Sequence, residues 1–284
     1  MKLLSGPTSD AAIPSVAVVA FLVLTFLITW GLMGTYVFFP DAAASRFGEI
    51  SGLHPFFIVA TWSPAIAAVV IVLRCSGAPG MRVFLARLLL WRCSAGWVIF
   101  IFLGLPLVFV AGSIIKGGPV LAALPPEGPR PVLTLLFIML FLGPIEEFGW
   151  RGVAQPLLQR HLAPFWAGGL IGAVWGLWHL PAFLLSGTVF ADWEFLPFLA
   201  GNVVLAVLVT PIFNQTRGSL LWPMLFHWQL INPFWPDAQP WDTWILLLVA
   251  VIVVWWNRDT MFTRESGVTE VLLPTRSLIF RAAK

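Results

Sequence analysis

Charge is the scarcest property of this sequence. Asp, Glu, Lys and Arg make up only 10% of the 284 residues, whereas 59% are hydrophobic and the mean hydropathy is +0.91. Soluble domains contain about 25% charged and about 45 to 50% apolar residues. An ordinary water-soluble domain is therefore excluded. The 16 basic residues exceed the 13 acidic ones by too little to make a basic patch, so we expect no nucleic-acid partner.

Cysteines and internal repeats are also scarce or missing. Cys75 and Cys93 are the only cysteines, which excludes a disulfide scaffold and predicts two inert thiols on the cytoplasmic side. No segment of the chain repeats another, which disfavours a transporter built from inverted repeats.

Long apolar runs are what the sequence does contain. They predict an all-α, polytopic membrane bundle of about eight transmembrane helices, in a single domain over residues 1–257. We expect the catalytic core at about 131–234 and a cytoplasmic tail at 258–284. The seventh run is short, which suggests a broken or tilted helix. The expected spans are 14–37, 55–73, 95–115, 131–157, 164–186, 195–213, 219–234 and 243–257.

Basic residues predict the orientation in the membrane. With the N-terminus inside, 12 of the 16 lysines and arginines fall in cytoplasmic segments, and only three fall in outer loops. This bias predicts an N-in, C-in arrangement by the positive-inside rule. The expected location is a cell membrane, with the bacterial inner membrane as the specific interpretation.

Five ionisable residues interrupt the apolar spans near mid-depth. A charge there costs about 2.5 to 3.5 kcal/mol on insertion scales, so such groups usually face the interior of a bundle and have a function. Arg151 follows Glu147 by four residues, a spacing that brings the two onto one helical face and leaves Glu146 free for a cavity. In the alternative, both glutamates only brace Arg151. The five are Glu146, Glu147, Arg151, His179 and His227.

A carboxylate and two imidazoles around a water molecule are groups that can catalyse hydrolysis. A buried Glu146 is a competent general base, and His179 can share the water or protonate a leaving amine. His227 can donate a hydrogen bond to the developing oxyanion.

Three motifs carry a resemblance to a known family. The stretch PIEEFGWRG at 144–152 resembles the EExxxR motif of the CAAX prenyl protease type II and bacteriocin-processing (CPBP, or Abi-like) intramembrane proteases. The stretch VWGLWHLPAF at 174–183 resembles the FxxxH motif of that family, with Trp175 in place of Phe. The stretch 214–227 resembles the segment that leads to the second histidine. Residues 135–232 carry the resemblance.

The resemblance implies an intramembrane endopeptidase that cleaves membrane-associated peptides or proteins within the bilayer. Glu146 and His179 would activate water, Glu147 and Arg151 would be the supporting pair, and His227 would stabilise the oxyanion. The family usually has Asn four residues after that histidine, but here Ile231 occupies this position and the Asn is Asn232. Local unwinding before Pro233 would bring Asn232 into place, and Asn202 is a spare amide donor.

The sequence leaves three alternatives: a zinc-dependent reaction and two functions other than proteolysis. Glu146, His179 and His227 would supply three zinc ligands, but the sequence lacks HExxH, so we commit to no cofactor and prefer a metal-independent reaction. A proton-coupled transporter would use the same residues as a proton relay. A non-catalytic, immunity-type binding protein is the third possibility.

Overall fold

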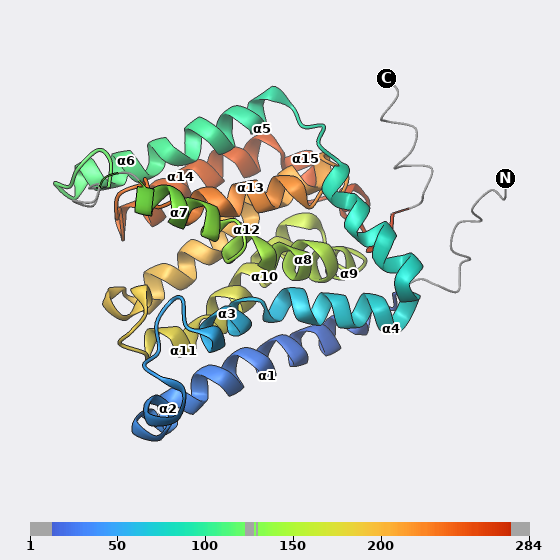
Figure 1. Ribbon diagram of the computed structural model, residues 1–284. Helices are drawn as coiled ribbons and strands as arrows, with labels where there is room; N and C mark the ends of the chain where they lie inside the picture. Colours follow the sequence, from blue (N-terminus) through green and yellow to red (C-terminus); the bar gives the residue numbers. More distant parts are fainter. Residues whose placement is uncertain (1–12, 123–127, 129, 274–284) are drawn as a thin grey trace.

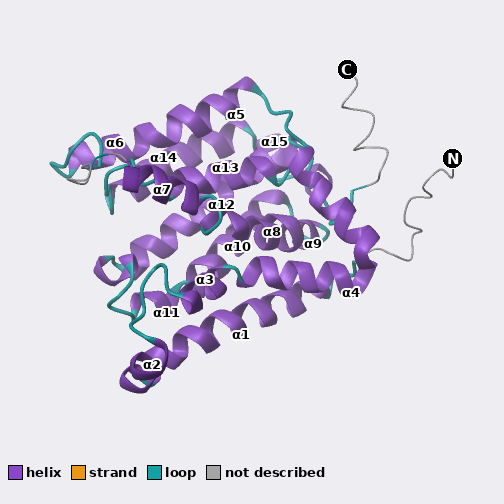
Figure 2. Cartoon of the chain, viewed as in Figure 1, coloured by secondary structure: helices purple, strands orange, loops and turns teal. Residues whose placement is uncertain are grey.

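The chain folds as a bundle of helices. The computed structural model describes residues 13–122, 128 and 130–273 (Figure 1). Over this part of the chain there are helices and loops but no strands (Figure 2). The all-α, polytopic membrane bundle expected from the sequence is confirmed.

Within the described residues, five helical segments are long and apolar enough to cross a membrane, and each of the other three predicted spans contains shorter helices. Two further short helices, α2 (Pro40–Phe47) and α15 (Arg258–Met261), lie outside the predicted spans. The orientation stays a prediction. The long segments are Ala17–Phe38 (α1), Ser63–Leu89 with α4 (Ser63–Leu85), Ala95–Ile115 with α5 (Ala95–Ile99) and α6 (Leu105–Ile115), Arg130–Gln159 with α7 (Arg130–Met139), α8 (Glu147–Gly149) and α9 (Gln155–Gln159), and Phe195–Gln215 (α12). The shorter helices are α10 (Pro164–Trp178), α11 (Leu180–Phe183), α13 (Leu221–Leu230) and α14 (Trp241–Trp256).

The second span differs from the expected range 55–73. A short helix, α3 (Pro55–Thr61), precedes α4, and the two are separated at Trp62. Pro64 explains the break, because proline lacks a backbone N–H and its ring collides with the carbonyl four residues earlier. Helical structure extends past the predicted end, with Arg74 on the exposed face, but the backbone of Gly77 (φ 59°) is not helical and divides α4 before Pro79.

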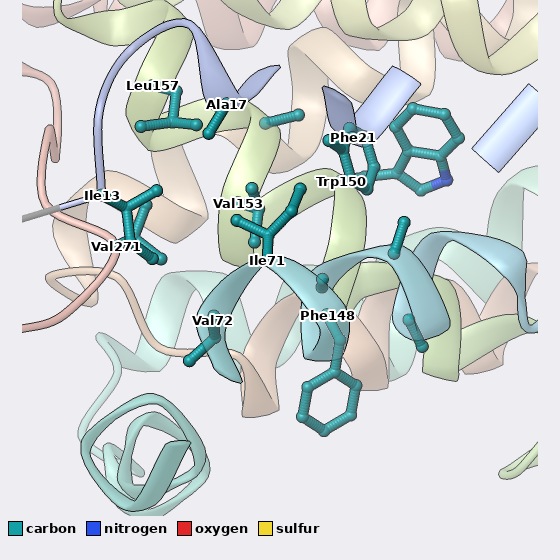
Figure 3. Packing of buried hydrophobic residues seen from close by; sticks show 14 of the residues in the cluster. Ile13, Ala17, Phe21, Ile71, Val72, Phe148, Trp150, Val153, Leu157 and Val271 are labelled. Carbon is teal, nitrogen blue, oxygen red and sulfur yellow. The ribbon is translucent and has the colours of Figure 1, made fainter. Parts of the chain in front are cut away.

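A buried apolar cluster holds the predicted fourth span at the centre of the bundle. Phe21 of α1 packs edge-on against Trp150, with ring centroids 5.3 Å apart (Figure 3). Ile71 of α4 and Val153 belong to the same cluster. The second half of the span, which carries the glutamates, is therefore covered by α1 and α4, whereas Leu133, Phe137 and Phe141 in its first half are exposed.

The outer faces of the bundle are apolar. On α14, Leu248, Val251 and Trp255 are exposed, whereas Leu246 and Ala250 are buried. A helix with apolar residues on both its buried and its exposed face suits a lipid environment.

Arg87 connects distant parts of the chain at one end of the bundle. It is fully buried and donates hydrogen bonds to four backbone carbonyls. Its Nε binds Gly218 O at 2.8 Å, Nη1 binds Gly152 O at 2.8 Å and Val271 O at 3.1 Å, and Nη2 binds Arg151 O at 3.3 Å. The guanidinium thereby ties the fourth span to the loop before α13.

The described part of the predicted tail packs against the bundle. Gln159 Nε2 donates to Val268 O at 2.8 Å, and Arg160 Nε donates to Thr269 O at 2.9 Å. Asn214 Oδ1 accepts a hydrogen bond from Val268 N at 3.0 Å. Residues 267–272 thus cover the ends of α9 and α12, while 274–284 lie outside the described residues.

Replacement of Arg87 by Lys should destabilise the fold. Lysine keeps the charge but lacks the planar fork, so at least one buried carbonyl loses its donor, at about 1 to 3 kcal/mol each. We expect the melting temperature in detergent to fall by about 4 °C or more. Arg82→Lys, at an exposed site on α4, is the control. Equal melting temperatures for the two variants would contradict the role assigned to Arg87.

Candidate active site

The fourth span is not a continuous helix, and its irregular turns set the directions of the two glutamates. A 3-10 turn at Gly143–Glu146 precedes α8, and a π-helical turn at Trp150–Ala154 follows it. Pro144 explains the first irregularity, because proline disfavours helical geometry in the residue before it. Turns of the π type occur often at functional sites.

Gly143 allows α13 to approach this turn closely. A Cβ atom added at Gly143 would lie 2.7 Å from Nε2 of His227 and 2.8 Å from a methyl carbon of Ile231. Only glycine leaves room for the imidazole at this position. The approach brings His227 beside the backbone that leads into Glu146.

Glu146 is buried and is held by two indole N–H groups. Its carboxylate Oε2 accepts hydrogen bonds from Trp175 Nε1 at 2.8 Å and from Trp150 Nε1 at 3.4 Å. The residue is only 3% exposed. Neither partner is an ion, so the Glu146 carboxylate forms hydrogen bonds but no ion pair within the described residues.

Glu147 lies between two basic groups. Its Oε2 accepts a hydrogen bond from Arg151 Nε at 3.1 Å, and its Oε1 accepts one from His227 Nδ1 at 2.8 Å. The pairing of Glu147 with Arg151 that the four-residue spacing predicts is present. The contact with His227 joins α8 to α13 and turns Nε2 of the imidazole toward the cavity, since Nδ1 is occupied.

A row of polar side chains continues from Arg151 toward the end of α9. Arg151 Nη1 donates to Gln155 Oε1 at 3.0 Å, and Gln155 Nε2 donates to Gln159 Oε1 at 3.2 Å. Gln159 also exchanges hydrogen bonds with Asn214 of α12. The buried guanidinium of Arg151 is thus bound by Glu147 through Nε and by Gln155 through Nη1.

His179 lies directly after α10 and has a defined tautomer. Its Nδ1 is 2.8 Å from the carbonyl oxygen of Trp175, which only accepts hydrogen bonds, so Nδ1 carries the proton. Nε2 is then the lone-pair nitrogen of a neutral ring. Trp178, Phe190 and Phe198 surround the imidazole with ring centroids 4.6 to 5.5 Å away.

The two asparagines make local contacts. Helix α13 ends at Leu230, so the chain is unwound before Asn232. Asn232 Nδ2 donates to Gln229 Oε1 at 3.1 Å, and its Oδ1 accepts from Phe234 N at 3.0 Å. Asn202 Nδ2 donates to Phe198 O at 2.9 Å. Both residues face the site, but neither hydrogen-bonds to a histidine.

One cavity of about 640 Å³ connects these groups. Its walls are mainly apolar and come from α1, α3, α10, α12, α13 and α14. Five of its polar lining residues are Glu146, His179, Asn202, His227 and Asn232. Glu147 and Arg151 lie behind the wall. Of the two adjacent glutamates, only Glu146 therefore lines the cavity.

The possible zinc ligands do not assemble into a metal site. Among the described residues, no three His, Cys, Asp or Glu side chains are disposed to hold a metal ion. The donors present do not fit the zinc site considered from the sequence.

Comparison with known proteins identifies the segment around this cavity. Residues 128–232 match the family model described as type II CAAX prenyl endopeptidase Rce1-like. All six predicted site residues lie inside the match. This segment is similar to the CPBP family. The resemblance carried by the three motifs is confirmed.

A curated relative of this CPBP segment is the CAAX prenyl protease 2 of Methanococcus maripaludis. It is 28% identical over 144 residues, which cover 46% of this chain and 53% of the relative. The chain thus spans about half the length of the curated relative that it matches.

The sequence pointed to the six site residues but missed the groups that hold them. Trp175 binds Glu146 with its indole and His179 with its carbonyl. The sequence did show Trp175 in place of the usual Phe of the motif, and this difference matters because the indole of Trp has an N–H group that Phe lacks. Trp150 and Arg87 gave no comparable signal.

Removal of the Glu147 charge should destabilise the CPBP core. Glu147→Gln leaves Arg151 buried without its carboxylate, at a cost of about 3 to 5 kcal/mol. The double variant Glu147→Gln/Arg151→Gln should lose less stability than the two single changes together. Denaturant unfolding in detergent measures all three. Glu146→Gln is the matched control and should cost less, because Glu146 has no ion pair. Strict additivity would contradict the coupling.

Proposed function

We propose that this chain is an intramembrane endopeptidase that hydrolyses peptide bonds with a water molecule activated by Glu146 and His179. The observation that carries the proposal is the shared cavity. Glu146, His179 and His227 line it together, inside the segment that matches the family model. The substrate would be a membrane-associated peptide or membrane protein, as the name of the Methanococcus relative suggests for that protein.

Glu146 would act as the general base. Both indole bonds reach Oε2, so Oε1 is left for a water molecule. The carboxylate takes a proton from the water as the oxygen attacks the scissile carbonyl carbon. The protonated Glu146 then gives this proton to the leaving nitrogen, the C–N bond breaks, and a carboxylic acid and an amine are released.

His179 would orient the water. The bond from Nδ1 to Trp175 O fixes the neutral tautomer and leaves Nε2 as an acceptor for the second O–H of the water. Trp175 holds both Glu146 and His179, so one residue sets the relative positions of base and imidazole. Such positioning contributes much of the rate in hydrolytic enzymes.

His227 would stabilise the oxyanion. With Nδ1 bound to Glu147, an imidazolium at this position presents Nε2–H to the cavity, and the carboxylate balances its charge. Arg151 in turn orients the Glu147 carboxylate. A preorganised donor of this kind contributes about 3 to 4 kcal/mol to transition-state stabilisation. Asn232 and Asn202 would be additional amide donors after a change of partner.

The proposal includes a bacterial inner membrane with both termini in the cytoplasm. The support is the excess of basic residues in the predicted inner segments. It also includes catalysis without zinc, supported by the absence of HExxH from the sequence and by the disposition of the donors in the described residues.

Substitution of the proposed base should abolish proteolysis. We expect Glu146→Gln and His179→Ala each to reduce cleavage of a fluorogenic peptide library about 100-fold or more, because the first removes the base and the second leaves the water without its orienting group. The library contains prenylated and unprenylated peptides, and the protein is purified in detergent. Glu265→Gln, at an exposed site, is the control.

Two outcomes would contradict the proposal. Cleavage that persists in Glu146→Gln would exclude this residue as the base. Loss of wild-type activity in a chelator, restored by zinc, would overturn catalysis without metal. Circular dichroism of each variant verifies that the helices are retained.

A further inference from the structure

The cavity lining includes acidic groups beyond the one that the proposed reaction uses. Its lining includes three carboxylates and no lysine or arginine among the described residues. Glu146 lies in the part of the cavity described above, and Asp237 and Asp242 come from the loop after α13 and the start of α14. The ligand that such a cavity favours carries positive charge.

Asp242, like Glu146, is a buried carboxylate that forms no ion pair within the described residues. The residue is 6% exposed and lies in the first turn of α14. Its Oδ1 accepts a hydrogen bond from the backbone N–H of Thr243 at 2.7 Å. No ion pair in the described part of the chain includes Asp242, because the nearby Lys116 pairs with Asp237 at the surface.

Burial without a counter-ion sets Asp242 apart from Glu147. An ionised carboxylate away from water is costly unless it is paired. Glu147 has Arg151 and His227 as partners. The N-terminus of α14 offsets part of the cost for Asp242, since its dipole favours negative charge, but it supplies no cation.

Close helix packing fixes the position of this carboxylate. Helices α6 and α14 lie side by side (Figure 1). A Cβ atom added at Gly112 of α6 would lie 3.1 Å from the backbone nitrogen of Asp242 and 2.9 Å from Cβ of Ala238. The backbone nitrogen of Asp242 also donates to Ala238 O at 3.1 Å. Asp242 is therefore part of a rigid wall, as a specific binding group should be.

The polar neighbourhood suits a cation rather than an anion. Thr243 and Gln239 line the same part of the cavity, and Trp235 adds an aromatic surface. Hydroxyl and amide oxygens accept hydrogen bonds from an ammonium or guanidinium group, and an aromatic ring attracts a cation.

We propose that Asp242 forms a subsite that selects a positively charged nitrogen of the peptide substrate, in a lysine or arginine side chain or at the amino terminus. This inference rests on the proposed protease function and adds a substrate class to it. The substrate would lie along the apolar cavity, with its scissile bond at Glu146 and its cationic group at Asp242.

Cleavage of matched peptides tests the subsite. Fluorogenic peptides carry lysine or its uncharged analogue norleucine at successive positions, each with a free or an acetylated amino terminus. We expect wild-type protein in nanodiscs to prefer lysine at one position by about tenfold or more in kcat/KM, and Asp242→Asn to remove this preference. A preference abolished by acetylation assigns the cation to the amino terminus instead.

A control variant distinguishes a specific subsite at Asp242 from a non-specific effect of the protein's negative charge. Asp192→Asn makes the same charge change at an exposed outer-loop residue that does not line the cavity, and should keep the lysine preference. Asparagine retains the carbonyl oxygen that accepts from Thr243, so Asp242→Asn is a mild change. The subsite is contradicted if Asp242→Asn lowers kcat/KM for lysine and norleucine peptides by the same factor, or if wild-type protein shows no preference.

A binding measurement keeps this test independent of the protease proposal. If wild-type protein cleaves no peptide, the protease proposal fails, and the subsite is tested by the affinity of labelled peptides for Glu146→Gln protein. We expect the lysine peptide to bind about tenfold more tightly than the norleucine peptide, and the difference to vanish in Glu146→Gln/Asp242→Asn. Equal affinities for both peptides would overturn the inference.

Discussion

The site depends on one buried carboxylate that binds two basic groups. Glu147 holds Arg151 on its own span and His227 on α13, and this pair of contacts joins two helices that are distant in sequence. In an apolar bundle the Glu147 carboxylate and the Arg151 guanidinium are acceptable only together, because each charge would be costly alone, and His227 satisfies the second carboxylate oxygen. The same contacts leave Nε2 of His227 and the neighbouring Glu146 at the cavity. Glu147 therefore supports the structure, and the adjacent Glu146 is left for the proposed chemistry.

Departures from regular helix make this division possible. On an ideal helix adjacent residues lie about 100° apart, so Glu146 and Glu147 must face different partners. The 3-10 turn before Glu147 and the π turn after it adjust those directions, and Gly143 lets His227 approach. Trp175 then holds Glu146 through its indole N–H and His179 through its carbonyl. Irregular backbone at membrane depth is tolerated here because protein covers it.

Periodic and local features of the sequence were predictable, and long-range contacts were not. Five of the eight predicted spans contain helical segments long enough to cross a membrane in the described part of the chain, and the other three contain shorter helices. The spacing of Glu147 and Arg151 predicted their pairing. The end of the second span was wrong, because hydropathy does not register the break at Pro64 or the exposed position of Arg74. Arg87 resembled an ordinary cytoplasmic arginine, since its carbonyl partners lie 64 to 184 residues away in the chain. Such contacts depend on tertiary packing alone.

Asn232 lies one residue later than the family pattern predicts, and the backbone geometry explains how it still reaches the cavity. The helical relation of four residues after His227 would apply only if α13 continued to position 231, but the helix ends at Leu230. In the unwound segment the side chain of Ile231 lies against Gly143, and Asn232 lines the cavity with its amide bound to Gln229. An Asn at this position can serve a substrate only by exchanging that local hydrogen bond for one to the ligand. His227, whose Nε2 needs no such exchange, is therefore the better preorganised group of the two.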